Sequence, residues 1–255
     1  MIDPRLSLAN SLVDGASLAK CEMFSVTTYN RTEVGHSGDS APAISNDILQ
    51  LMEHGELSLA GKQRPITRRT IYPRLASASR FRKMPGGLSI SAFEQIITNS
   101  FFASGPDRNR RPYASAGALY SVQAFVHIWN VKGYEPGTYH VLPISCALES
   151  VSAAPIDLLD RSVFCQDLKP LSHACFSLFY AAAAVLPIAK YGNAGLRLAT
   201  MEAGAMYQQA EQCAARFNVR SRVLNSTFHE NLCRLHGASP KLLWPLAFQV
   251  FGKEA

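Results

Sequence analysis

The sequence predicts an α+β fold, in which helices pack against a sheet of several strands. Two observations lead to this prediction. Short apolar runs rich in β-branched and aromatic residues recur along the chain, as is typical of buried strands. Segments whose apolar residues recur at helical spacing alternate with them, which favours a sandwich of sheet and helices. A length of 255 residues and an apolar content of 47% are ample for such a core.

The first elements in order are helices separated by a connector. Residues 45–47 (Ser-Asn-Asp) precede an apolar stretch and predict a short capped helix. Residues 60–78 contain two prolines and no helical period, so we expect an extended basic connector. Residues 89–91 (Ser-Ile-Ser) are predicted to cap a helix whose apolar residues continue to Phe101.

Strands dominate the middle of the chain. Residues 122–131 are mostly apolar, which predicts a strand covered on both faces. Residues 137–142 and 146–151 are two short strand-like runs joined by a turn that contains proline, so a hairpin is expected. We interpret residues 156–167 as a helix.

The last third of the chain begins with a buried strand at residues 175–183, after which Pro187 is expected to turn the chain. Residues 194–217 are rich in alanine and form the strongest predicted helix. Three shorter elements complete the prediction: a brief strand or turn at 223–224, a helix at 227–235 and a final strand at 242–251.

The net charge of +6 is unevenly distributed. Residues 1–61 hold eight acidic and three basic side chains, a net charge of −5, so the remainder carries +11. Residues 62–83 contain eight basic side chains and no acidic one. This segment could be a solvated linker, an anion site for a cofactor phosphate, or a surface for an acidic protein or peptide. Since no nucleic-acid-binding module accompanies the charge, we expect no nucleic-acid partner.

The six cysteines and seven histidines do not indicate a metal site or a secreted protein. No Cys-x-x-Cys spacing occurs, and the histidines lack the spacing of a zinc helix, so we expect reduced thiols and no metal. The first twenty residues mix charged with apolar side chains, unlike a secretory signal. The longest apolar run, residues 174–189, is too short to span a bilayer. We therefore expect a cytoplasmic protein without a membrane partner.

Two unusual stretches are candidates for a functional site. Residues 110–120 read Arg-Arg-Pro-Tyr-Ala-Ser-Ala-Gly-Ala-Leu-Tyr. The small side chains of Ser115, Ala116 and Gly117 would leave backbone N–H groups open to a flat or anionic ligand, although an ordinary loop before a strand could look the same. The second stretch, residues 189–197, places Lys190 and Tyr191 at the entrance of the long helix.

Together these stretches resemble the nitroreductase-like, flavin-dependent dehydrogenases of peptide azole biosynthesis, the SagB type. Members carry an Arg-Pro-Tyr-Pro-Ser-x-Gly-Ala-Leu-Tyr-Pro run, then a Lys-Tyr pair, an Arg and a Glu-x-Gly-x-x-x-Gln helix. The matching residues here are 111–120, Lys190, Tyr191, Arg197, Glu202, Gly204 and Gln208. The resemblance extends from about residue 79 to residue 252. Ala114 and Ser121 stand where the family has proline, which loosens the loop backbone.

The resemblance implies a nitroreductase-like FMN-binding domain at residues 77–255, preceded by an N-terminal extension at 1–76 that contacts partners or peptide. Arginine suits a phosphate because its planar guanidinium donates two hydrogen bonds at once. The cofactor-binding residues that we predict are Arg80, Arg82, Arg111, Ser115, Ala116, Gly117, Gln208, Arg222 and Asn225. Glu202 and Arg197 are expected to be structural ion-pair or capping groups.

The implied reaction is the oxidation of thiazolines or oxazolines in a peptide to the aromatic azoles. The unperturbed pKa of a phenol is about 10, but a nearby ammonium favours the anion. Lys190 and Tyr191 are therefore the predicted catalytic pair that removes the Cα proton, while a hydride passes from Cβ to flavin N5. Adjacent residues of a regular helix point about 100° apart, so their convergence requires irregular backbone, for which Pro187 and Gly192 are suited.

The family also implies partners: an azoline-bearing precursor peptide, cyclodehydratase and leader-binding subunits of a synthetase complex, and a second copy of the chain. Two other functions remain open at the level of sequence. One is an NAD(P)H-dependent nitro- or quinone reductase on the same fold. The other is a flavin-free scaffold subunit of a peptide-modifying complex.

Overall fold

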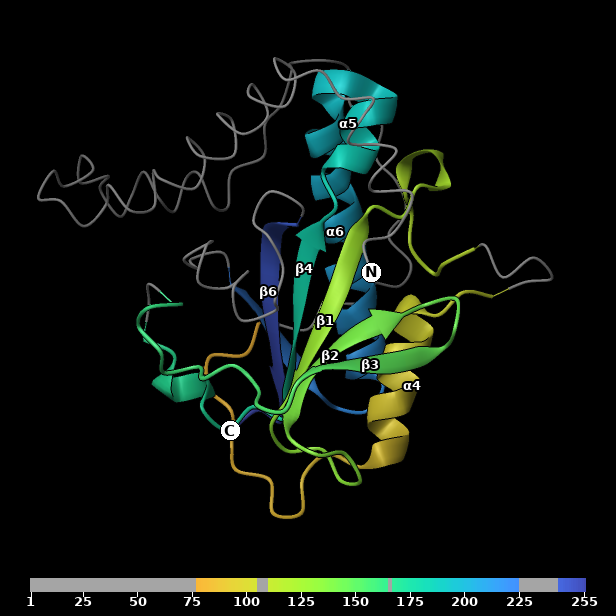
Figure 1. Cartoon of the computed structure of the whole chain (residues 1–255). Coiled ribbons are helices and arrows are strands. Elements are labelled where there is room, and N and C mark those ends of the chain that lie inside the picture. Colours follow the sequence, from red (N-terminus) through yellow and green to blue (C-terminus); the bar gives the residue numbers. More distant parts are fainter. Residues whose placement is uncertain (1–76, 105–109, 165–166, 225–242) are drawn as a thin grey trace, which may run out of the picture. The chain divides into compact units, whose positions relative to one another are not determined.

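The structure, a computed structural model, describes residues 77–104, 110–164, 167–224 and 243–255. Within these ranges, six strands form one antiparallel sheet in the order β3-β2-β1-β4-β6-β5 (Figure 1). The strands are β1 (Val122–Ile128), β2 (Gly137–Leu142), β3 (Ala147–Ser152), β4 (Phe176–Ala182), β5 (Arg220–Leu224) and β6 (Trp244–Gly252). Helices pack on this sheet, so the predicted α+β architecture is confirmed.

The register of the central strands defines two ends of the sheet. Val122, the first residue of β1, lies opposite Ala182, the last residue of β4, which in turn lies opposite Trp244. We call this the upper end, since it lies next to α5 in Figure 1. At the opposite, lower end, Ile128 lies opposite Phe176. β1 has seven residues, so the two ends are about 20 Å apart.

Two helices cover one face of the sheet and complete the main core. Helix α4 (Ile90–Phe101) begins at Ser89, whose hydroxyl accepts a hydrogen bond from the Ala92 N–H at 3.3 Å, as predicted. Helix α6 (Gly195–Ala215) is the alanine-rich helix and buries small residues against the strands. Figure 1 shows α6 behind the strands, with α4 beside it. None of the described helices is long and apolar enough to cross a membrane.

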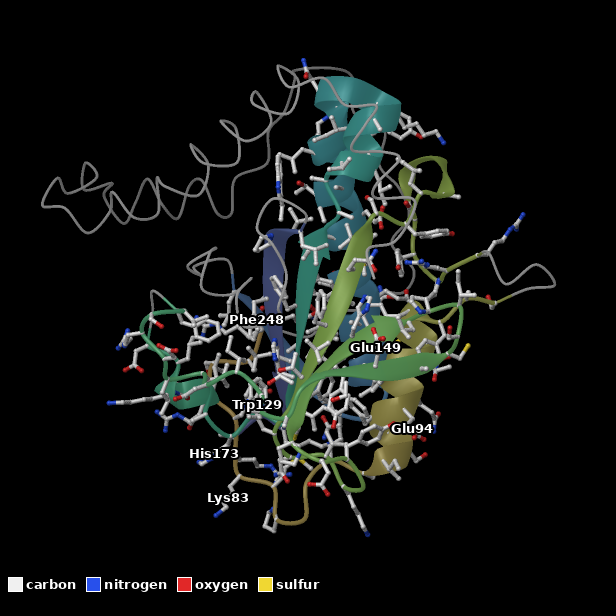
Figure 2. All side chains as sticks on the ribbon, viewed as in Figure 1. Lys83, Glu94, Trp129, Glu149, His173 and Phe248 are labelled. Carbon is white, nitrogen blue, oxygen red and sulfur yellow. The ribbon has the colours of Figure 1, made fainter. Side chains whose placement is uncertain are left out.

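A second apolar cluster, rich in phenylalanine, covers the other face of the sheet. Phe125, Phe179 and Phe248 of the sheet pack there against Phe81 and Phe164 from the flanking segments. Figure 2 shows Phe248 and Trp129 on this side, whereas Glu94 lies on α4. Both faces of β1 and β4 are therefore covered, which explains why their sequences are almost continuously apolar.

Most predicted elements are confirmed within one to three residues at their ends, including the hairpin of β2 and β3. The expected helix at residues 156–167 is wrong: residues 156–164 form successive turns. The Asp157 carboxylate accepts a hydrogen bond from the Leu159 N–H, and the Asp160 carboxylate accepts one from the Ser162 N–H, both at 2.8 Å. Such local bonds compete with helical ones and stabilise turns instead.

The segment around Pro187 also differs from the expectation. Pro187 does not turn the chain but is the third residue of a short helix, α5 (Val185–Tyr191). Proline is tolerated there because the N–H groups of a first helical turn have no partner within the helix. Three short 3₁₀ turns complete the described elements: η1 (Ala116–Ala118), η2 (Lys169–Leu171) and η3 (Gly192–Ala194). The helices predicted after residue 47 and at 227–235, and the N-terminal extension at 1–76, lie outside the described residues.

Candidate functional site

The two motifs singled out in the sequence meet at the upper end of the sheet. Turn η1 comes just before β1, and α5 comes just after β4, so the register of these strands brings the two together. The Lys190 ammonium lies 3.4 Å from the Gly117 carbonyl oxygen. A Cβ atom built on Gly117 would overlap the Tyr191 hydroxyl oxygen and lie 2.6 Å from Lys190 Nζ. Both polar groups therefore converge on the α-carbon of Gly117.

The backbone at the end of α5 allows two adjacent side chains to converge. Tyr191 leaves the helical conformation (φ −124°, ψ 6°), and Gly192 follows with φ 55° and ψ −137°. This is the irregularity for which Gly192 is suited. Lys190 Nζ lies 5.5 Å from the centroid of the Tyr191 ring. Lys190 is exposed and Tyr191 half-buried, so the pair is accessible to a molecule from outside.

The turn that carries Gly117 has an unusual backbone. Gly117, Ala118 and Tyr120 have positive φ angles of 57°, 53° and 49°. This region is uncommon for residues with a side chain, and for a bulky residue such as Tyr120 it indicates strain that other contacts must hold in place. Strained backbone of this kind is concentrated at functional sites.

Ser115 supplies one of those contacts. Its hydroxyl accepts a hydrogen bond from the Tyr120 N–H at 2.8 Å and donates one to a carboxylate oxygen of Glu202 at 2.6 Å. The side chain of Ser115 therefore points into the protein. Ala116 is half-buried and Gly117 exposed, so the open part of the predicted ring-binding surface is their backbone.

Glu202 is a buried carboxylate of α6 that is bonded to this turn. It also accepts hydrogen bonds from the backbone N–H groups of Val122, at 2.9 Å, and Ser121, at 3.4 Å. Burial raises the pKa of Glu202, and the hydrogen bonds from Ser115 and the two backbone groups oppose that rise. The structural role expected for Glu202 is thus served by hydrogen bonds to a loop. Arg197, on the same helix, is exposed.

Arg111 contacts two tyrosines of its own loop. Its guanidinium donates a hydrogen bond to the Tyr113 hydroxyl at 3.0 Å and lies 4.4 Å from the centroid of the Tyr120 ring. Burial raises the pKa of Tyr113 to about 12, although the nearby Arg111 lowers it. These contacts hold the loop; the predicted contact of Arg111 with a cofactor stays a prediction.

Arg80 and Arg82 lie at the lower end of the sheet. Their segment pairs with the chain end after β6: the Arg82 N–H donates to the Lys253 carbonyl oxygen at 2.9 Å, and the Ala255 N–H donates to the Arg80 carbonyl oxygen at 3.3 Å. Both arginine side chains are exposed. In Figure 2 the neighbouring Lys83 lies at this end, far from α5. The predicted phosphate and ring contacts are therefore at opposite ends of the described sheet.

Lys253 is a basic residue at this end that the sequence interpretation missed. Burial, and then the nearby charge of Arg82, lower the pKa of Lys253. Its ammonium donates a hydrogen bond to the Phe217 carbonyl oxygen at 2.5 Å. Only its position two residues after the last predicted strand could have drawn attention to it.

The remaining predicted residues are spread over other elements. Gln208 is half-buried on α6, six residues after Glu202 and hence about 9 Å further along the helix. Arg222 is half-buried on β5, opposite Val250. Asn225 lies outside the described residues. In the described part of the chain, no group of three or more His, Cys, Asp or Glu side chains could hold a metal ion.

Comparison with known proteins relates this geometry to a family. No protein-family model matches the chain. The microcin B17-processing protein McbC of Escherichia coli is 34% identical over 169 residues, which are 65% of this chain and 62% of McbC. A chain in the solved E. coli microcin synthetase McbBCD complex, with truncated pro-MccB17 bound, superposes with a TM-score of 0.82. That match covers 100% of this chain and 98% of the other, at 26% identity. The chain is thus similar to McbC both in sequence and in fold.

More distant solved structures show the fold alone. A putative nitroreductase from Ralstonia eutropha superposes with a TM-score of 0.57 at 17% identity, over 75% of this chain and 88% of that one. One from Anabaena variabilis gives 0.55 at 18% identity, over 70% of this chain and 37% of that one. The McbC-like chain therefore has the nitroreductase fold that the resemblance implied. The sequence alignment with McbC spans less than two thirds of that relative's length.

Proposed function

We propose that this McbC-like protein is an FMN-dependent oxidoreductase that converts thiazolines and oxazolines of a modified peptide into thiazoles and oxazoles. One observation carries the proposal: the Lys190 ammonium and the Tyr191 hydroxyl converge on Gly117, in the strained turn that matches the family motif. The similar microcin synthetase complex has a truncated peptide precursor bound, which supports a peptide substrate and synthetase partners for this chain as well.

The described residues fit an FMN phosphate at the lower end of the sheet. Arg82 and Lys253 are close enough for the charge of one to lower the pKa of the other. An anion placed between such cations would relieve their repulsion, and arginine would add two directed hydrogen bonds. At the upper end, the exposed backbone of Gly117 fits the edge of a flat ring.

When bound, FMN would supply the hydride acceptor of the reaction. The chain would supply the base. Tyr191 Oη, as the phenolate, would accept the Cα proton of the azoline. The Lys190 ammonium would stabilise that phenolate and assist the proton transfer. The strained turn would hold Gly117 against both groups, so that they face the same bound ring. Exposure of Lys190 would leave the peptide a route to them from solvent.

A second copy of the chain would complete the site. The outer side of α6 carries Met201, which is 66% exposed, beside the small residues Gly204 and Ala205. Such a surface suits close packing of two helices around a twofold axis. The phosphate-binding and ring-binding ends of one subunit are about 20 Å apart, since β1 separates them. We propose that one FMN contacts Arg82 of one copy and Gly117 of the other.

Mixed dimers test this shared site. Arg82→Ala and Gly117→Ala homodimers should each retain only about a hundredth of the wild-type activity, because every site has one of its ends altered. After coexpression, half of the dimers are mixed and each contains one intact site, so about a quarter of the wild-type azoline oxidation should return. The rate of azole formation by the purified mixture is the measurement. No recovery would mean that a single subunit binds the whole cofactor.

The proposed reaction itself is tested on the purified protein with an azoline-bearing precursor peptide. We expect a yellow protein with a flavin spectrum, little affected by NADPH, and the loss of two hydrogens per ring in the mass spectrum of the peptide. Rapid bleaching by NADPH without azole formation would favour the nitro- or quinone reductase. A colourless protein that still assembles with synthetase subunits would favour the scaffold role.

A further inference from the structure

Glu202 joins helix α6 to the turn that carries Gly117. Its side chain is only 3% exposed. A buried carboxylate is costly unless hydrogen bonds replace the lost water, and here they all come from one short segment. One oxygen accepts from the Val122 N–H. The other accepts from the Ser115 hydroxyl and, at 3.4 Å each, from the Ser121 N–H and hydroxyl.

These bonds hold the turn on both sides of its strained part. Ser115 comes before the three positive-φ residues, whereas Ser121 and Val122 come directly after them. The Ser115 hydroxyl also accepts a hydrogen bond from the Tyr120 N–H, so the position of Tyr120 depends on Glu202 as well. A single carboxylate therefore fixes where Gly117 stands relative to α6.

The same helix also fixes the Lys-Tyr pair. Gly195, the first residue of α6, lies directly on the backbone of α5: a Cβ built there would be 2.5 Å from the Pro187 carbonyl carbon and 2.6 Å from the Ile188 nitrogen. Helix α5 is thus packed backbone to backbone against the start of α6. Glu202 follows Gly195 by seven residues, about two helical turns. Both halves of the candidate site are consequently attached to one rigid element.

We propose that Glu202 is a positioning residue, which binds the turn at residues 115–122 to α6 and so sets Gly117 against Lys190 Nζ and Tyr191 Oη. The proposal rests on the proposed function in that the positioned pair is the base of the reaction. Glu202 itself touches neither substrate nor cofactor. Loss of the Glu202 carboxylate should displace the turn while Lys190, Tyr191 and Gly117 all remain in the site. A displacement of about 1 Å can reduce a rate about 100-fold.

Glu202→Gln is the appropriate variant, since it keeps the shape but replaces one acceptor oxygen by an NH₂ group facing N–H or O–H donors. Tyr180→Phe is the matched control. It removes another buried hydrogen bond of the core, from the Tyr180 hydroxyl to Gln249 at 2.8 Å, and leaves the turn untouched. Both variants are compared with the wild-type full chain by amide hydrogen exchange and by azoline oxidation.

In Glu202→Gln we expect the amides of Tyr120, Ser121 and Val122 to exchange at least about ten times faster, since an opened hydrogen bond exposes the amide to water. The kcat should fall about 10- to 100-fold with the KM for the peptide unchanged. Tyr180→Phe should change neither. If Glu202→Gln does not fold, Ser115→Ala removes two hydrogen bonds, one to Glu202 and one from the Tyr120 N–H, and should speed exchange at Tyr120.

Wild-type exchange at these three amides in Glu202→Gln would overturn the proposal, and so would a kcat no lower than that of Tyr180→Phe. Exchange does not depend on turnover. If the wild-type protein oxidises no azoline, the proposed function falls, while the exchange comparison still decides whether Glu202 holds the turn.

Discussion

Lys190→Ala and Tyr191→Phe are each expected to slow azoline oxidation about 100- to 10,000-fold, the range typical of a lost general base. The two groups lie against the same glycine, so either substitution leaves the other without the neighbour that makes it effective. FMN should stay bound, because the proposed phosphate contacts lie at the other end of the sheet. Single-turnover azole formation, with the flavin spectrum recorded in parallel, measures both effects.

Two surface substitutions provide the controls for this experiment. Lys132→Ala removes another exposed lysine, and Tyr134→Phe removes another hydroxyl, which donates a hydrogen bond to Glu94 of α4. Neither residue lies at the upper end of the sheet, so both variants should oxidise azolines at the wild-type rate. A double variant, Lys190→Ala with Tyr191→Phe, that also retained that rate would remove the pair from the chemistry.

The sequence allowed most of the sheet and both long helices to be predicted, because their signals are local. The buried strands β1 and β4 are continuous apolar runs, and Ser89 marks the start of α4. The predicted helix at 156–167 failed for an equally local reason. Its aspartates bind nearby N–H groups and stabilise turns, and apolar spacing alone does not reveal this competition.

The site was less predictable, because its contacts join residues far apart in the chain. Nothing in the local sequence of residues 115–117 indicates that Lys190 and Tyr191 lie against them; only the family resemblance linked the two motifs. Glu202 was expected to be structural, but its bonds to a turn some 80 residues earlier required the structure. Lys253 went unnoticed for the same reason: its proximity to Arg82 depends on how the chain end pairs.

Gly117→Ala is expected to reduce azoline oxidation about 100-fold, the cost typical of misplacing catalytic groups by about 1 Å. The added Cβ would overlap the Tyr191 hydroxyl oxygen and press on Lys190 Nζ, so both groups must move. Because both are ends of side chains, the fold should tolerate the change. The measurement is the rate of azole formation at saturating peptide, accompanied by thermal unfolding.

Gly86→Ala separates this collision from backbone strain. Gly86 has a φ of +78°, which lies in the left-handed region like the +57° of Gly117. A Cβ at Gly86, however, would meet no atom within 4 Å. Both substitutions should therefore cost a similar amount of stability, roughly 1–2 kcal/mol for placing a side chain in the left-handed region. Only Gly117→Ala should lose activity. Equal activity of the two variants would show that the reaction does not require the positions of Lys190 and Tyr191 that Gly117 allows. The glycine would then be needed only for the backbone conformation of the turn.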